Sequence, residues 1–218
     1  MNLFLLDVDG TLVNSKVLDQ RCLTQAISDV LGVTIDPDWS HYQNVTDSGV
    51  LDEILSKHQI DESRSLVHRK VEARYLELVR TEMATHPHAE YQIEGAKEFV
   101  SHLAQRADTH VAIATGGWES VAKLKLRTVG IDTSSLTFAS SSDAISRTEI
   151  MALATFRAKQ DSGAVFERRV VIGDGEWNRN ASRELGYDFV AVGHQVDHHT
   201  QLTNMTHYQS VFSQLALQ

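Results

Sequence analysis

Residues 3–13, LFLLDVDGTLV, set the fold expected of this chain. The run LFLL is short, apolar and free of polar alternation, which is typical of a strand buried on both faces of a parallel sheet. The run ends at Asp7, and Gly10 allows the backbone to turn sharply. Because side chains two residues apart in extended chain point the same way, we expect Asp7 and Asp9 to face one pocket at the end of this strand.

Two further apolar runs end on a polar residue in the same manner. VAIA, residues 111–114, stops at Thr115, and VVIG, residues 170–173, stops at Asp174. Two more strands are expected at 136–139 and 189–192, and helical spacing of apolar residues is found between the strands at 96–107, 121–129, 149–157 and 178–185. This alternation predicts an α/β fold with a doubly wound parallel sheet, in which ligands bind beyond the carboxyl ends of the strands.

The segment 14–91 interrupts the alternation of strand and helix. Its patterns are helical throughout, at residues 17–31, 47–57 and 63–83. We therefore predict an inserted all-helical domain over 14–91, and an α/β core domain made of residues 1–13 and 92–218.

Composition limits the classes of function. The chain has 218 residues, which fits one domain with a sizeable insertion. Its 20 Lys and Arg against 29 Asp and Glu give a net charge of −9, so neither nucleic acid nor an anionic membrane is expected as a partner. Cys22 is the single cysteine, and the apolar run at 3–6 is far shorter than a signal-peptide core. A reducing, cytoplasmic location is expected.

The polar residues at the three strand ends form the candidate site. Two carboxylates in one pocket are costly to keep ionised unless a cation or proton compensates, and Mg²⁺ with oxygen ligands is a common solution. Asp174 would add a third acid, while the stretch Thr115-Gly116-Gly117 offers a hydroxyl and unhindered N–H groups for phosphate oxygens. The alternative for Asp7 and Gly10 alone is a loop turn without chemistry.

These motifs resemble those of the haloacid dehalogenase (HAD) superfamily, in order and across nearly the whole chain. DVDGTLV (7–13) is similar to the first motif of the family, ATGG (114–117) to the second and GDGEWN (173–178) to the fourth. The insertion directly after the first motif looks like the small helical cap of the phosphoglycolate-phosphatase-like branch.

The resemblance implies a Mg²⁺-dependent phosphatase that acts on a small phosphorylated metabolite. Asp7 would attack phosphorus to form an aspartyl-phosphate, and Asp9 would serve first as acid and then as base. The metal ligands that the resemblance implies are Asp7, the carbonyl of Val8 and Asp174, and the implied phosphate-binding groups are Thr115, Gly116 and Arg147.

Two positions depart from the commonest family pattern. Arg147 stands where a lysine is usual, which keeps the charge on a bulkier side chain whose alternative role is a solvated helix start. Asn178 replaces a second acid of the fourth motif, so it is expected to be a weak metal ligand or to orient a neighbour, with Glu176 as a possible compensating acid.

Other residues have a functional and a plain structural interpretation. Thr46 and Asp47 open a predicted helix, where an N-cap explains them; the alternative is that they reach the substrate from the insertion. Trp118 and Trp177 could line the pocket or pack against helices.

Three rival functions stay open. A dehalogenase of the same superfamily needs neither Asp9 nor a metal, and a phosphomutase would share both aspartates with a phosphatase. A catalytically degenerate binding or regulatory protein is suggested by Arg147 and Asn178. The sequence indicates neither the substrate nor the oligomeric state.

Overall fold

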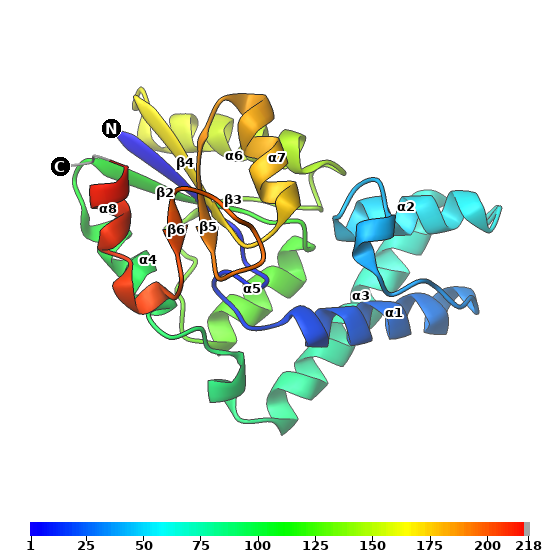
Figure 1. The fold of residues 1–218 in the computed structure, drawn as a ribbon. Helices are drawn as coiled ribbons and strands as arrows, with labels where there is room; N and C mark the ends of the chain where they lie inside the picture. The colour runs from blue at the N-terminus through cyan, green and yellow to red at the C-terminus, as the bar shows by residue number, and fades with distance from the viewer. Residues whose placement is uncertain (216–218) are drawn as a thin grey trace.

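The computed structural model, which describes residues 1–215, contains a six-stranded sheet in which every pair of neighbouring strands is parallel (Figure 1). The strand order is β3-β2-β1-β4-β5-β6, so the order reverses at β1, which lies between β2 and β4. The doubly wound sheet predicted from sequence is confirmed. The strands are β1 (Asn2–Leu6), β2 (Thr109–Ala114), β3 (Thr137–Ala139), β4 (Arg168–Gly173), β5 (Asp188–Val192) and β6 (Gln201–Leu202).

Strand β1 is buried on both faces, as its unbroken apolar run predicts. Phe4 and Leu6 belong to one hydrophobic cluster, which they share with residues of α4 (Ala96–Gln105), α5 (Glu119–Thr128) and α8 (Ser210–Gln214). Leu3 and Leu5 belong to a second cluster, together with residues of α6 (Arg147–Ser162) and α7 (Glu176–Leu185). Helices therefore cover both faces of the sheet.

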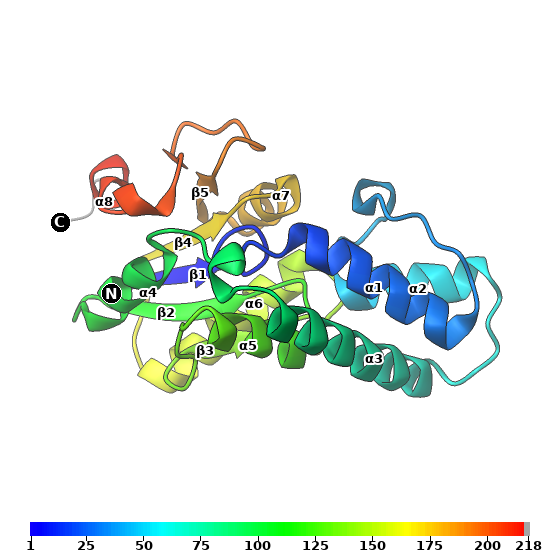
Figure 2. The same ribbon diagram turned by 90° about the horizontal axis from the view of Figure 1, so that it is seen from below.

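The segment 14–91, called the helical insertion below, contains α1 (Lys16–Leu31), α2 (Asp47–Lys57) and α3 (Arg64–Thr85). Short 3-10 helices lie at Trp39–His41 and His88–Tyr91. Figure 2 shows α1, α2 and α3 grouped at one end of the molecule, beyond the sheet. On α3 the buried residues recur every fourth position, which is the spacing of one helix face: Val67, Val71, Tyr75, Val79 and Met83.

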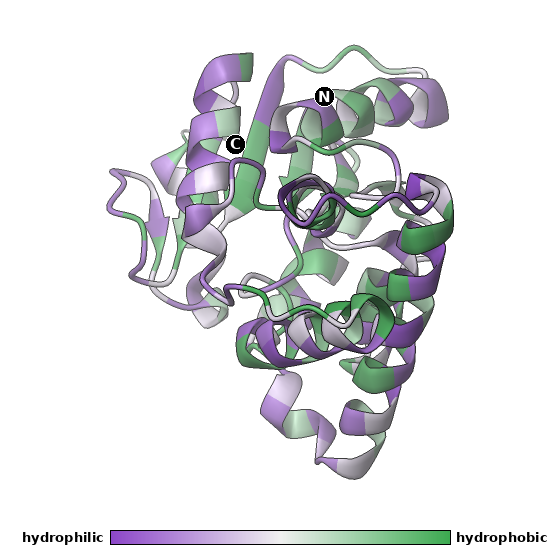
Figure 3. Cartoon of the chain, turned by 90° about the vertical axis from the view of Figure 1, so that its right-hand side faces the viewer, coloured by the Kyte–Doolittle hydropathy of each residue, from purple (hydrophilic) through white to green (hydrophobic). Residues whose placement is uncertain are grey.

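Along the helices of the insertion, hydrophobic residues (green) are interspersed with hydrophilic residues (purple), as Figure 3 shows. Leu23, Ala26 and Ile27 of α1 are buried and belong to the same hydrophobic cluster as the α3 face. Within residues 1–215, no helix combines the length and the hydrophobicity that crossing a membrane requires.

The chain enters and leaves the helical insertion through adjacent segments. Val13 pairs with Gln92 in an antiparallel bridge, and the Asn14 N–H donates to the Tyr91 carbonyl over 2.8 Å. The helical insertion is therefore joined to the sheet at one place, directly beside the loop that follows β1.

Candidate active site

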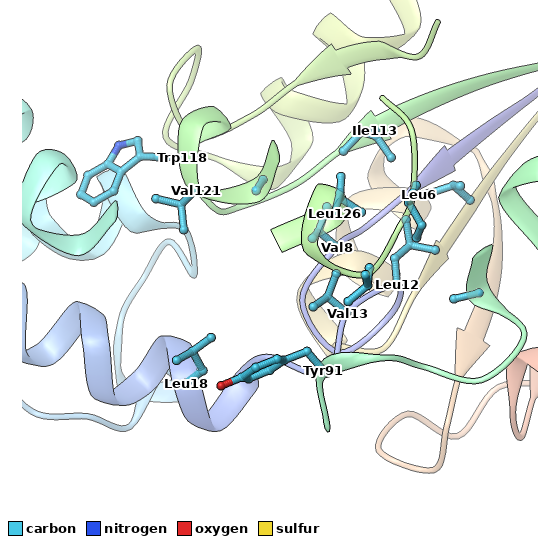
Figure 4. Packing of buried hydrophobic residues seen from close by; sticks show 14 of the residues in the cluster. Leu6, Val8, Leu12, Val13, Leu18, Tyr91, Ile113, Trp118, Val121 and Leu126 are labelled. Carbon is cyan, nitrogen blue, oxygen red and sulfur yellow. The ribbon is translucent and has the colours of Figure 1, made fainter. Parts of the chain in front are cut away.

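The loop after β1 is anchored by its apolar residues and carries the acids Asp7 and Asp9. Val8, Leu12 and Val13 are fully buried, and Figure 4 shows them packed near Leu126 of α5. Gly10 has φ +76°, and a Cβ there would lie 2.2 Å from an oxygen of Asp174, so both the turn and the close approach require glycine.

Asp7 lies at the centre of the site and is 2% exposed. Its Oδ1 accepts the Val8 N–H at 2.9 Å. Its Oδ2 accepts from the Arg147 guanidinium at 2.8 Å and from the Asn178 amide at 2.9 Å. Three N–H donors thus hold one buried carboxylate in a fixed orientation, and one of them carries a full positive charge.

Asp9 is held by a different set of partners. Its Oδ1 accepts from the Ser15 hydroxyl at 2.7 Å and is ion-paired with Lys125 of α5. Burial alone would raise the pKa of Asp9, but the attraction of the Lys125 ammonium holds that pKa below its ordinary value.

Lys125 was not predicted from the sequence, although a signal for it exists. On α5 the buried positions are 121, 122, 125 and 126, so Lys125 lies within the apolar stripe of the helix. It has no exposed surface, and it also bonds Asp19 of α1 at 2.9 Å. A lysine in a buried stripe needs acidic partners, and that requirement could have marked it.

Asp174 comes from the end of β4 and is 4% exposed. Its Oδ2 forms an ion pair with Lys16, the first residue of α1, whose ammonium also donates to Gln195 at 2.7 Å. Its Oδ1 is buried and has no hydrogen-bond partner within residues 1–215. Burial, followed by the charge of Asp7, raises the pKa of Asp174 to about 6.

This arrangement fits a hard cation. Asp7 and Asp174 are oxygen donors, and the unpartnered Oδ1 of Asp174 has capacity for another ligand. Within residues 1–215, no three His, Cys, Asp or Glu side chains are grouped so as to hold a metal. A magnesium ion here would therefore have two carboxylate ligands, with waters among the rest.

Val8 and Asn178, both expected at or near the metal, already make hydrogen bonds within the protein. The Val8 carbonyl accepts the N–H groups of residues 11, 12 and 13 at 2.8–3.2 Å, so its lone pairs are used inside the turn and it does not fit as a ligand. Asn178 is fully buried; its amide nitrogen faces Asp7, and its Oδ1 accepts the Gly175 N–H at 3.2 Å. Its geometry therefore suits it to orienting Asp7.

The predicted phosphate-binding groups meet beside Asp7. Thr115 follows β2, is fully buried and accepts the Gly117 N–H at 3.2 Å. Arg147 begins α6 behind a Ser146 capping box and lies against Gly116, where a Cβ would be 2.3 Å from its guanidinium. The Arg147 Nε also donates to the Val45 carbonyl of the helical insertion at 3.1 Å.

A cavity of about 570 Å³ lies between the core and the helical insertion. Thr46 and Asp47 both line it. The Thr46 hydroxyl donates to the Ile145 carbonyl and caps α2, so its polar atom is already engaged. Asp47 accepts the Trp118 N–H at 2.8 Å, and burial raises its pKa to about 7 although the Lys125 ammonium lowers it.

The remaining candidates, Trp118, Trp177 and Glu176, lie in three different surroundings. Trp118 is 2% exposed, contacts the Tyr75 ring edge to face and donates to Ser48, so it packs between core and insertion. Trp177 lines the cavity, where the cations of Lys16 and Arg147 each lie 5.8 Å from its ring centroid. Glu176 is exposed and pairs with Arg179.

Residues 4–176 match the family of haloacid dehalogenase-like hydrolases, and the chain belongs to that family. A comparison with curated protein sequences finds no match.

Solved structures share the fold at low sequence identity. A β-phosphoglucomutase from Clostridium difficile superposes with a TM-score of 0.71 at 13% identity, with 99% of both chains covered. CbbY from Rhodobacter sphaeroides, solved in complex with phosphate, gives 0.69 at 18% identity, covering 94% of this chain and 95% of that chain. A hydrolase from Pseudomonas syringae gives 0.65 at 19% identity, covering 88% and 83%.

Proposed function

We propose that this hydrolase is a Mg²⁺-dependent phosphatase, which cleaves a small phosphorylated metabolite through an aspartyl-phosphate on Asp7. The observation that carries the proposal is the meeting of Asp7, Asp9 and Asp174 with Arg147 at one sheet edge, next to a cavity of about 570 Å³. Acids that can attack and transfer protons, beside a cation that can bind phosphate, are the groups that phosphoryl transfer needs.

Asp7 supplies the nucleophile. One of its carboxylate oxygens forms a bond to phosphorus, while the bond from phosphorus to the leaving oxygen breaks. The three donors on Asp7 fix the direction of attack before substrate arrives. Water then attacks the aspartyl-phosphate, which releases inorganic phosphate and restores the carboxylate.

Asp9 moves the protons. Its Oδ1 is held by Ser15 and Lys125, whereas Oδ2 accepts no hydrogen bond within residues 1–215 and Asp9 lines the cavity. Oδ2 would pass the proton of a substrate phosphate monoanion to the leaving oxygen, and would later take a proton from the attacking water and pass it to the released phosphate.

Asp7 and Asp174 would hold the magnesium ion. The Asp9 carbonyl accepts no hydrogen bond in the described part of the chain and would be the backbone ligand in place of Val8. When bound, the ion offsets the negative charges of phosphate and nucleophile. Lys16, now paired with Asp174, would give up that partner.

The phosphate oxygens would be bound by groups of the core, and the rest of the substrate by the helical insertion. The Gly116 N–H makes no hydrogen bond within residues 1–215, and the Thr115 hydroxyl proton is likewise available. Asp47, Trp39 and Tyr75 of the insertion line the other side of the cavity. Enclosure between the two parts would keep water from the aspartyl-phosphate until hydrolysis.

One assay separates the phosphatase from two of its rivals, the phosphomutase and the binding protein. Purified protein is incubated with a panel of phosphorylated metabolites and 4-nitrophenyl phosphate, with Mg²⁺ or with EDTA, and free phosphate is measured. We expect Mg²⁺-dependent release of phosphate that is lost in Asp7→Asn. Return of the phosphoryl group to an isomeric sugar phosphate would instead indicate a phosphomutase, and no turnover of any ester would indicate a binding protein.

A further inference from the structure

Lys125 joins three separate segments of the chain at one buried ammonium. It lies on α5 with no exposed surface, and fully buried lysines occur almost only with charged partners. One partner is Asp9, in the loop after β1. The other is Asp19 on α1 of the helical insertion, 2.9 Å away. The lysine therefore connects the proposed proton-transfer residue to the helical insertion.

The two carboxylate oxygens of Asp9 have different surroundings. Oδ1 takes the Lys125 ammonium and the Ser15 hydroxyl, the latter at 2.7 Å. Oδ2 has no such partner in the described chain, and a Cβ placed on Gly117 would lie 3.3 Å from it. Binding one oxygen of a carboxylate in this way fixes the plane of the group and directs the other oxygen toward the cavity that Asp9 lines.

Asp19 makes this arrangement depend on the helical insertion. Its Oδ1 accepts from the Tyr75 hydroxyl of α3 at 2.6 Å as well as from Lys125, and its Oδ2 is buried without a partner within residues 1–215. The lysine is thus shared between an acid of the core and an acid whose position is set by α1 and α3.

We infer that Lys125 is a positioning residue, which orients Oδ2 of Asp9 toward the reacting oxygen. Because Lys125 also pairs with Asp19, this orientation depends on how the helical insertion packs against the core. The inference rests on the proposed phosphatase function. It concerns a residue outside the recognised family motifs, and it assigns Lys125 no contact with substrate.

The test is a double-mutant cycle between Lys125→Met and Asp9→Asn, with 4-nitrophenyl phosphate and Mg²⁺ as the probe. Methionine keeps most of the volume and removes the charge. In the wild-type background we expect kcat to fall by about tenfold or more with KM little changed, since orientation of Asp9 is lost while the phosphate-binding groups remain. In the Asp9→Asn background, the same substitution is expected to change kcat by less than about twofold.

Lys123→Met is the matched control, because Lys123 lies on the same helix, is partly exposed and pairs with Glu119. It is expected to leave both kinetic constants unchanged. A loss from Lys125→Met that is equal in both backgrounds, or that appears in KM alone, would overturn the inference and make the lysine purely structural.

Thermal unfolding of each variant keeps the result interpretable. If Lys125→Met does not fold, Lys125→Gln, which retains a donor toward Asp9, is used in the same cycle; failure of both to fold would also overturn the positioning role. Wild-type protein without any phosphoester turnover would refute the proposed function, whereas an active wild type with additive losses would refute only the inference about Lys125.

Discussion

Asp7 and Asp9 of the α/β core and Asp47 of the helical insertion lie around the cavity in opposite surroundings. On the core, Asp7 accepts three N–H donors, including the Arg147 guanidinium, and Asp9 is paired with Lys125. On the insertion, Asp47 accepts a single hydrogen bond, from the backbone of Trp118, and makes no ion pair within residues 1–215.

The difference appears in the proton affinities of the two groups. Burial raises the pKa of Asp47 to about 7, and burial together with the charge of Asp9 raises the pKa of Asp19 to about 6. For Asp9, by contrast, burial is outweighed by the charge of Lys125 together with hydrogen bonds from Lys125 and Ser15, and the pKa is lowered. Asp9 is therefore favoured in its charged form, whereas Asp47 is only partly ionised near pH 7; Asp174 of the core, whose pKa burial raises to about 6, lies between the two.

The largest effect expected on the core side is that of Asp7→Asn. The amide cannot act as the nucleophile, so the rate of phosphate release should fall below about a hundredth of the wild-type rate. Asp61→Asn, an exposed aspartate of the insertion, is the control and should remain fully active. A rate above that limit in Asp7→Asn would exclude the covalent route.

Arg147→Ala is expected to have the next largest effect. It removes the positive charge beside Asp7 and the bond to the Val45 carbonyl, and should cost about 2 kcal/mol of transition-state stabilisation, measured from kcat/KM. Arg147→Lys should recover part of the activity, since charge is retained but the second contact is lost. Full activity in Arg147→Ala would exclude the side chain from phosphate binding.

The core could be predicted from sequence because its signals are local. An apolar run followed by an acid gives a buried strand and a carboxylate at its end, and the rules for parallel sheets bring such ends together. Strand β6 was missed, since the two residues Gln201–Leu202 are too short to show a period.

The details of the site depend on contacts between distant segments, which no local pattern records. Lys125 and Asp19 are 106 positions apart, and the Val8 carbonyl is turned inward by three N–H groups of its own loop. Thr46 was left with two interpretations because its partner, the Ile145 carbonyl, is 99 positions away. Long-range partners of this kind decide which oxygen of an acid is free.

Asn178→Asp places a buried carboxylate in the core that has no cation of its own within residues 1–215, which is the situation of Asp47 in the insertion. The fully buried amide that donates to Asp7 over 2.9 Å becomes a second carboxylate, so without metal we expect a stability loss of about 2 kcal/mol. Mg²⁺ would offset that repulsion. The midpoint of thermal unfolding should therefore rise more on addition of Mg²⁺ in the variant than in the wild type. An equal rise in both proteins would place the metal away from position 178.

Asp47→Asn tests the insertion side and is expected to have the smallest effect. The folded pKa of about 7 lies above the ordinary value of 3.8, so the folded state binds this proton more tightly than the unfolded chain does. The stability that Asp47 contributes is therefore complete below about pH 4 and is lost as pH rises through about 7. Asparagine stays neutral at every pH and can still accept the Trp118 N–H through its carbonyl oxygen.

Urea unfolding of metal-free protein at pH 4 and pH 8 measures this difference. Asp47→Asn should lie close to the wild type near pH 4 and be more stable by at least about 1 kcal/mol at pH 8, because one pKa unit corresponds to about 1.4 kcal/mol. Asp38→Asn is the control: Asp38 also lines the cavity, but hydrogen bonds from Ser40 lower its pKa, so its replacement should bring no gain at pH 8. If Asp47→Asn changed stability equally at both pH values, the pKa of Asp47 would be the same in the folded and unfolded states, and the contrast between Asp9 and Asp47 would not hold.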